Sequence, residues 1–124
     1  MMQLLFIALG GAIGAVLRFV VSNAVYASAG RDFPYGTLTV NVVGSLLMGV
    51  LYVLLVERFA MAGEWRAFLL VGLLGAFTTF STFSIETLTL IENGAHARAL
   101  ANMLLSVMLC VFATWAGVVA ARQL

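Results

Sequence analysis

The chain has 124 residues, of which 64% are hydrophobic and 9% are charged, and its formal net charge is +1. A soluble domain carries about a quarter charged residues, so this composition excludes a soluble globular enzyme and a disordered chain. All the basic residues are arginines and they form no basic patch, so a nucleic-acid partner is excluded as well. We predict a single all-α integral membrane domain that covers residues 1–124.

Four apolar stretches are long enough to cross the hydrocarbon core of a bilayer, which takes about 20 helical residues. The predicted membrane spans are Gln3–Ala27, Gly36–Val56, Arg66–Ile91 and Ala97–Ala121. No basic residue precedes the first span, so we do not expect a cleaved signal peptide. Four spans place both termini on the same side of the membrane.

The arginines in the short loops are divided almost equally between the two sides, which bears on orientation. We expect Arg58, Arg66 and Arg122 on one side, Arg31 and Arg98 on the other, and Arg18 a few turns inside the first span. A chain without a bias can insert in both orientations and form an antiparallel, dual-topology homodimer. The alternative is one orientation that other features determine. A chain this short has little room to enclose a pore alone, which favours the dimer.

The first span carries a G-x-x-x-G pattern at Gly10 and Gly14, for which we expect close helix packing. Arg18 follows one turn later. Charged residues within a span are costly, and two interpretations of Arg18 stay open. Its side chain either extends to the interface near the first loop, or lines a wet vestibule and attracts an anion.

In the second span, Asn41, Ser45 and Gly49 recur every four residues and therefore share one helical face, which Thr37 extends toward the loop. An asparagine amide in a membrane needs partners for two donors and one acceptor. Asn41 either forms a hydrogen bond across a helix interface or directs its NH₂ group at a passing anion. Its spacing favours neither.

The third span is the most informative, because two glycines precede a run in which serine and threonine alternate with phenylalanine. These residues are mediocre helix formers whose hydroxyls compete for backbone groups. We therefore predict a helix break near Gly75–Thr79, at the middle of the membrane. The restarted helix would offer amides to an anion, and the preceding half would offer carbonyls to a cation.

Phe80 and Phe83 are three residues apart and share one face of the restarted helix, where they either pack in the core or turn their positive ring edges toward an anion. Phe77 is expected to pack. Glu86, the one acid well inside a span, either pairs with Arg18 from another helix or marks an ion entrance.

The fourth span carries polar residues spaced by four, namely Asn102, Ser106, Cys110 and Thr114. They form either a line of donors and acceptors along a pore or a polar contact between helices. The chain contains no metal-ligand spacing, carboxylate pair, nucleophile elbow or phosphate loop, so we do not expect an enzyme.

Three motifs in chain order resemble those of the Fluc-type fluoride channels, the CrcB family. They are Gly10-Gly-x-x-Gly-Ala-x-x-Arg18, Gly36-Thr-Leu-x-Val-Asn41-x-x-Gly-Ser45 and Gly75-x-x-Thr-Thr-Phe-Ser-Thr-Phe-Ser-x-Glu86. The resemblance covers essentially the whole chain, and the hydroxyl–phenylalanine string is its most specific part. It implies an antiparallel homodimer in the bacterial inner membrane, with two pores that export fluoride passively and relieve fluoride toxicity.

The resemblance also implies roles for individual residues. Asn41 would hydrogen-bond fluoride, Phe80 and Phe83 would line its path edge-on, and Ser81, Thr82 and Ser106 would add hydroxyls. The backbone carbonyls of Gly75 and Thr78 from two copies would hold a structural sodium ion at the dimer axis. In some relatives tyrosine stands where Asn102 falls and a hydroxyl where Cys110 stands, so these two positions depart from the pattern. Arg18, Thr37 and Glu86 are further pore or vestibule candidates.

A small multidrug-type, proton-coupled exporter is the alternative from another class, because such transporters also have four short spans and can have dual topology. An exporter of this kind needs an acid in its first span. Here that span holds Arg18 and no acid.

Overall fold

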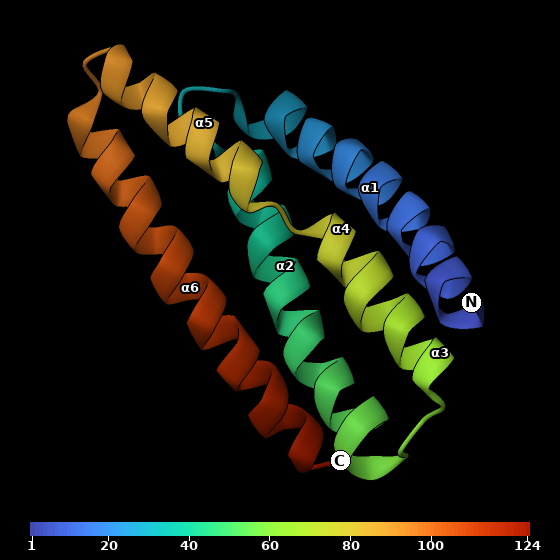
Figure 1. Cartoon of the computed structure of the whole chain (residues 1–124). Coiled ribbons are helices and arrows are strands. Elements are labelled where there is room, and N and C mark those ends of the chain that lie inside the picture. The colour runs from blue at the N-terminus through green and yellow to red at the C-terminus, as the bar shows by residue number, and fades with distance from the viewer.

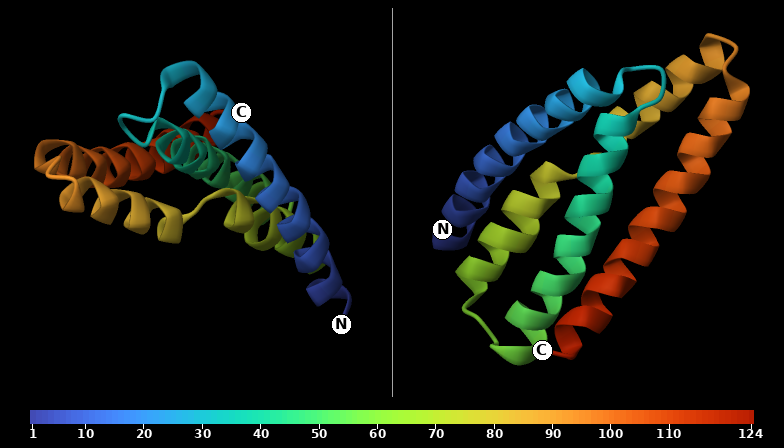
Figure 2. Two further views of the ribbon diagram at one scale, coloured as in Figure 1. Left: turned by 90° about the horizontal axis from the view of Figure 1, so that it is seen from above. Right: turned by 180° about the vertical axis from the view of Figure 1, so that it is seen from behind.

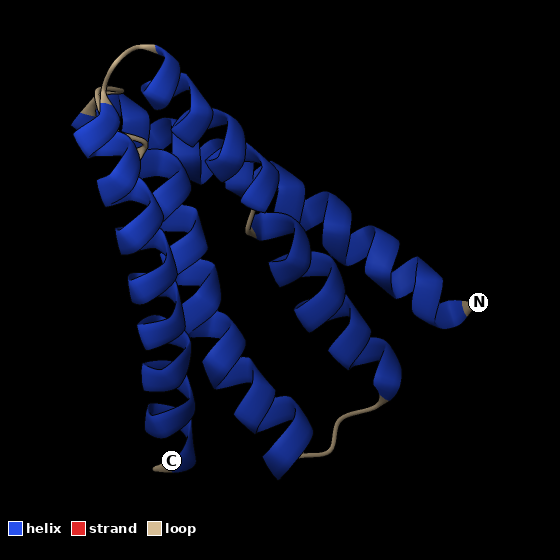
Figure 3. Ribbon diagram, turned by 60° about the vertical axis from the view of Figure 1, so that its left-hand side comes forward, coloured by secondary structure: helices blue, strands red, loops and turns tan.

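The computed structural model describes Met1–Leu124, and all of its regular structure is helical (Figures 1 and 3). The elements in chain order are α1 (Met2–Ala29), α2 (Tyr35–Tyr52), the π-helix η1 (Val53–Arg58), α3 (Gly63–Arg66), the π-helix η2 (Ala67–Leu74), α4 (Gly75–Phe77), α5 (Phe80–Glu92) and α6 (His96–Arg122). The two π-helical segments were not predicted, because their i to i+5 hydrogen bonds leave no distinct hydrophobic period in the sequence.

These elements form four stretches that are long and apolar enough to span a membrane. They are Met2–Ala29, Tyr35–Arg58, Gly63–Glu92 and His96–Arg122. The predicted all-α architecture with four spans is confirmed, and the largest difference lies at the start of the third span. That helix begins at Gly63 rather than Arg66, because the carbonyl of Ala62 already accepts the N–H groups of Trp65 and Arg66.

Helices α1 and α6 lie at opposite edges of the molecule, and α2 and the third span lie between them (Figure 2). Helix α2 packs along α6, and η2 packs along α1. Both termini lie toward the end that carries the loop between η1 and α3, opposite the loop between α1 and α2 (Figure 1). This arrangement leaves α5 in contact with α6 on one side of α2.

Glycines permit the two closest helix contacts. A Cβ atom on Gly14 would lie 2.1 Å from the Leu73 carbonyl oxygen, and one on Gly10 would lie 2.3 Å from that of Phe68. Gly49 meets the backbone of α6 in the same way, with its Cβ position 2.2 Å from the Thr114 carbonyl oxygen. The packing role that the sequence indicates for Gly10 and Gly14 is confirmed, because only glycine lets these backbones touch.

Few side chains are enclosed: 22 of 124 residues are buried, and large apolar side chains cover much of the outer surface. In water such a surface would aggregate, but a lipid bilayer or another protein surface covers it without loss. The fold therefore has the surface of a membrane protein.

The backbone leaves the helical conformation at two residues of the third span. Thr78 has φ −86° and ψ 157°, and Thr79 has φ −150° and ψ 121°, so both are extended between α4 and α5. Gly75 itself is helical, with φ −60° and ψ −35°. Figure 3 shows this non-helical segment between two helical stretches.

Candidate functional site

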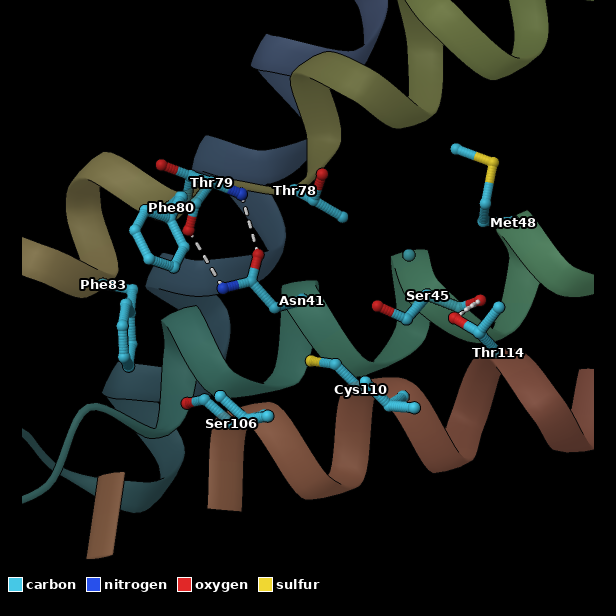
Figure 4. A pocket seen from close by; sticks show the side chains of 13 residues that line it. Asn41, Ser45, Met48, Thr78, Thr79, Phe80, Phe83, Ser106, Cys110 and Thr114 are labelled. Atoms are coloured by element: carbon cyan, nitrogen blue, oxygen red, sulfur yellow. Dashed lines mark hydrogen bonds between the residues drawn. The ribbon is translucent and has the colours of Figure 1, made fainter. Parts of the chain in front are cut away.

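A cavity of about 380 Å³ lies beside the two extended residues, between α2, α5 and α6 (Figure 4). Its polar lining comes from α2, from α6 and from the extended residues themselves: Asn41 and Ser45, then Ser106, Cys110 and Thr114, and finally Thr78 and Thr79. None of the residues that line it carries a charge. An ion in this cavity would therefore meet dipoles and ring edges rather than a fixed counter-charge.

Asn41 binds the extended backbone of Thr79 through both ends of its amide. Its Nδ2 donates to the Thr79 carbonyl oxygen at 3.0 Å, and the Thr79 N–H donates to its Oδ1 at 2.7 Å (Figure 4). The first of the two interpretations of Asn41, a hydrogen bond across a helix interface, therefore holds for its amide oxygen and for one of its two N–H groups. The second N–H of the amide has no partner within the chain and remains free to act on a ligand in the cavity.

Two carbonyl oxygens next to the extended residues have lost the donors that a continuous α-helix would supply. The N–H of Thr79 would donate to the Gly75 carbonyl, but it donates to Asn41. The N–H of Thr82 would donate to the Thr78 carbonyl, but it donates to Thr79 Oγ1 at 3.2 Å, which caps α5. Both oxygens are thus left for a partner outside the helix.

Arg18 reaches this region from α1, because its Nε donates to the Ala76 carbonyl oxygen at 3.0 Å. The guanidinium thereby places positive charge at the C-terminal end of the helical stretch before Thr78, where the helix dipole favours it. Its one hydrogen bond is to α4 and not to the first loop. Both interpretations of Arg18, at the membrane interface or in a wet vestibule, stay predictions.

Phe80 and Phe83 both line the cavity, with ring centroids 5.2 Å apart and ring planes inclined by 43° (Figure 4). The Phe80 side chain is 77% exposed, so the chain by itself does not enclose it. Phe77, by contrast, is buried and packs as expected.

The polar residues of α6 divide between two environments. Asn102 is buried and donates to Thr87 Oγ1 at 2.8 Å, while Ser106 donates to Asn102 Oδ1 at 3.3 Å. Thr114 donates to the Ser45 carbonyl oxygen at 3.0 Å. Asn102 therefore belongs to a polar contact between α5 and α6 and does not line the cavity. Cys110 does line it.

Glu86 is bound to α1 through Tyr26, whose hydroxyl donates to Glu86 Oε2 at 2.6 Å. The pairing of Glu86 with Arg18 is therefore wrong within this chain, because both side chains have neutral partners instead. Glu86 lines a second cavity, of about 500 Å³, together with Tyr26, Arg31 and Arg98.

Several predicted residues lie away from the first cavity. Ser81 is exposed, Thr82 accepts from Thr79 Oγ1, and buried Thr37 contacts the Tyr26 hydroxyl. Sequence reasoning assigned no role to Tyr26, because a tyrosine near the end of a span is an ordinary interfacial residue. The signal that could have identified Tyr26 is its hydroxyl near the end of the first span, a possible hydrogen-bond partner for Glu86, the one acid well inside a span.

Comparisons with known proteins agree over the whole chain. The family model described as CrcB-like protein, Camphor Resistance (CrcB) matches residues 5–118. The protein from Magnetococcus marinus is 56% identical over 121 residues, which are 98% of each chain, and that from Geobacter sulfurreducens is 50% identical over the full length of both. The one from Methylococcus capsulatus is 59% identical over 99% of this chain, which spans only 54% of that relative's length.

Each of these relatives bears the name fluoride-specific ion channel FluC. Identities of this size over nearly the full length, together with a family match that covers most of the residues, show a common family. The chain belongs to the CrcB family.

Proposed function

We propose that this chain is a fluoride channel that lets fluoride leave the cytoplasm passively and so relieves fluoride toxicity. The single observation that carries the proposal is the uncharged cavity next to the extended residues, lined by an amide, hydroxyls and two phenylalanine rings. The relatives' name, fluoride-specific ion channel, supports the choice of ion. The chain is a multi-pass protein of the inner membrane, and it is not an enzyme.

The free donors in the cavity suit a small anion that must exchange its hydration shell for protein groups. Asn41 keeps one N–H free, and the Ser45 hydroxyl and the Cys110 thiol have no partner within the chain. Phe80 and Phe83 add ring edges with positive electrostatic potential. Because no full positive charge lines the cavity, an ion that binds there can also leave, which conduction requires.

The exporter alternative has no support. Its coupling carboxylate should stand in the first span, where the ionisable side chains are Arg18 and Tyr26 and no acid is present. The one intramembrane acid, Glu86, is on α5 and is bound by Tyr26.

The function is tested in liposomes loaded with potassium fluoride, with a fluoride electrode outside and a potassium ionophore added to dissipate the membrane potential. We expect rapid fluoride release, and no chloride release from liposomes loaded with potassium chloride. Phe80→Ile keeps an apolar side chain but removes the ring edge, so fluoride release should fall roughly tenfold, the equivalent of about 1.4 kcal/mol. Phe112→Ile, on the outer surface of α6, is the matched control and should conduct normally. No fluoride release from the wild-type protein would exclude the channel.

We further propose that two copies assemble antiparallel, so that each pore has walls from both. Backbone that has left the helix at membrane depth is tolerated only where protein or a water-filled cavity covers it. Gly75, Phe80 and Ser81 are nevertheless exposed around the extended residues, which calls for a protein cover rather than lipid. Arginines stand at both ends of the molecule, which supports insertion in both orientations. Arg58 donates to the Arg122 carbonyl oxygen at one end, and Arg98 donates to the Asp32 carbonyl oxygen at the other.

Dual topology predicts that a loop residue is accessible from both sides of the membrane. The test places a cysteine at exposed Ala62 in a Cys110→Ser background. A membrane-impermeant maleimide should label about half of the protein molecules in intact cells and all of them after the membrane is opened. Complete protection, or complete reaction in intact cells, would show a single orientation.

The same two copies would hold a structural sodium ion. The Gly75 and Thr78 carbonyl oxygens are hard ligands without helical donors, and Gly75 lies on the exposed face of the chain, so the residues fit such an ion. A two-fold axis through this face would bring four oxygens together. When bound, the ion would link the two copies electrostatically and would not be transported.

If sodium links the copies, removing it should weaken the assembly. We expect the dimer to have a higher apparent Kd when the protein is purified in N-methyl-D-glucamine salts than when it is purified in sodium salts. The Kd is measured by diluting the protein in lipid and following energy transfer between two fluorescent labels. Potassium or lithium in place of sodium tests the selectivity of the oxygens. The same dimer affinity in all of these salts would contradict a sodium-linked interface.

A further inference from the structure

The hydroxyl of Tyr26 forms the centre of a hydrogen-bond network that joins α1, α2 and α5. It lies 2.6 Å from Glu86 Oε2 and 3.2 Å from Thr37 Oγ1, and it accepts from the Thr37 N–H at 3.3 Å. A tyrosine hydroxyl has one proton and two lone pairs. The proton goes to the carboxylate, at a distance typical of a charge-assisted bond, and the two lone pairs accept from Thr37.

This network supplies the only donor to the Glu86 carboxylate. Its second oxygen, Oε1, is enclosed and has no hydrogen-bond partner. The one ion pair in the chain joins Glu57 to Arg122, so no arginine contacts Glu86. Its position therefore depends on Tyr26, which is buried with 8% of its surface exposed.

Two arginines share a cavity with this carboxylate. Arg31 and Arg98 line the same cavity of about 500 Å³ as Glu86, with Asp32 as the other acid there. The guanidinium carbon of Arg31 lies 4.5 Å from the centre of the Tyr26 ring, which fixes it beside the network. A carboxylate released from Tyr26 would turn toward these cations, because a charge in such a site needs a partner.

We propose that Tyr26 is a positioning residue for conduction: its hydroxyl holds Glu86 against α1 and α2, which keeps Arg31 and Arg98 unpaired with its carboxylate, so that they attract an anion into this second cavity. Within the chain the two guanidinium groups donate only to neutral acceptors, Asn23 Oδ1 and the Asp32 carbonyl oxygen. This inference rests on the proposed fluoride conduction. The groups that face Glu86 are Tyr26 from α1, Thr37 from α2 through the tyrosine hydroxyl, the loop residues Arg31 and Asp32, and Arg98 from α6.

The position of the carboxylate is tested without reference to conduction, by NMR of protein in lipid with ¹³C-labelled glutamate carboxyl groups. The chain has four glutamates, and the Glu86 resonance is the one missing from Glu86→Gln. We expect Tyr26→Phe to move this resonance and to leave the other three in place. Tyr52→Phe, which removes the hydroxyl of an exposed tyrosine on α2, is the matched control and should leave the Glu86 resonance in place. An unmoved Glu86 resonance in Tyr26→Phe would overturn the proposal.

The consequence for conduction is tested by fluoride release from liposomes. Tyr26→Phe should reduce fluoride flux roughly tenfold, as expected for the loss of one hydrogen bond to a charged group. Unchanged flux in Tyr26→Phe with a moved resonance would show that Tyr26 does not act on conduction. If Tyr26→Phe does not fold, Thr37→Val is the second variant, because it removes the Thr37 hydroxyl and leaves the Thr37 N–H as a donor to Tyr26. It should shift the Glu86 resonance and lower the fluoride flux, each by a smaller amount.

Glu86→Gln keeps an acceptor for Tyr26 but cannot form an ion pair with arginine. In that background the further effect of Tyr26→Phe on flux should disappear, because a neutral carboxamide does not bind Arg31 or Arg98. A tenfold loss that persists in the Glu86→Gln background would show that Tyr26 acts through another group. Wild-type protein that does not conduct fluoride would remove the proposed function, whereas the NMR result would still decide the role of Tyr26 in holding Glu86.

Discussion

Asn41→Asp is expected to reduce fluoride release from liposomes at least about 100-fold. An aspartate keeps the acceptor for the Thr79 N–H but loses the donor to the Thr79 carbonyl, so two oxygens face each other across the 3.0 Å contact. Loss of a buried hydrogen bond costs about 1–3 kcal/mol, and a carboxylate in the cavity repels an anion besides. The measurement is the initial rate of release per protein at equal reconstitution.

Gln123→Glu makes the same exchange of an amide for a carboxylate elsewhere on the chain. Gln123 is exposed after the end of α6 and lines neither of the two cavities. This variant should conduct within about twofold of the wild type, because a solvent-screened charge has a small effect. Equal losses in both variants would show that Asn41 acts through general electrostatics rather than through its contact with Thr79.

Gly14→Ala is expected to destabilise the protein severely. Its new Cβ would lie 2.1 Å from the Leu73 carbonyl oxygen and 2.9 Å from the carbonyl carbon, and neither backbone atom can move without separating α1 from η2. Overpacking of this kind costs about 1–3 kcal/mol or more. We expect a clear fall in the temperature at which the protein in detergent loses its monodisperse elution peak.

Gly11→Ala is the matched control for this change. It lies on the same helix, yet the nearest atom to its Cβ position is the Gly72 carbonyl oxygen at 3.9 Å, an ordinary contact. Alanine also favours a helix over glycine by about 1 kcal/mol. Gly11→Ala should therefore match or exceed the wild type in stability. A fall of the same size in both variants would mean that the glycine contacts do not decide how closely α1 and η2 pack.

The four spans were predictable because a bilayer leaves a chain few options. Backbone groups in hydrocarbon must be bonded internally, so each long apolar stretch becomes a helix. The helix ends were predicted less well. The third helix begins at Gly63, within a polar stretch, because the N–H groups of Trp65 and Arg66 donate to the Ala62 carbonyl. A hydropathy profile does not reveal such backbone hydrogen bonds. The π-helical segments η1 and η2 depend on backbone bonding alone, which no residue pattern reveals.

The site was predictable to the extent that single residues were costly in a membrane. Asn41 stood out for that reason, but its partner is the backbone of Thr79, and a backbone group has no sequence signature. Opposite charges suggested that Glu86 and Arg18 pair. The fold instead satisfies the arginine with the Ala76 carbonyl and the acid with Tyr26, because those neutral groups lie on the helices that pack against them.

The central claim, that the chain forms a fluoride-selective pore, is tested most directly by electrical recording in a planar bilayer. With a tenfold fluoride gradient, an opposed tenfold chloride gradient and equal sodium on both sides, the current should reverse at the fluoride equilibrium potential, about 59 mV from zero. Under the same gradients, Phe80→Ile should reduce the current measured at 0 mV without changing the reversal potential. Reversal near zero, or at the chloride potential, would contradict a fluoride-selective pore.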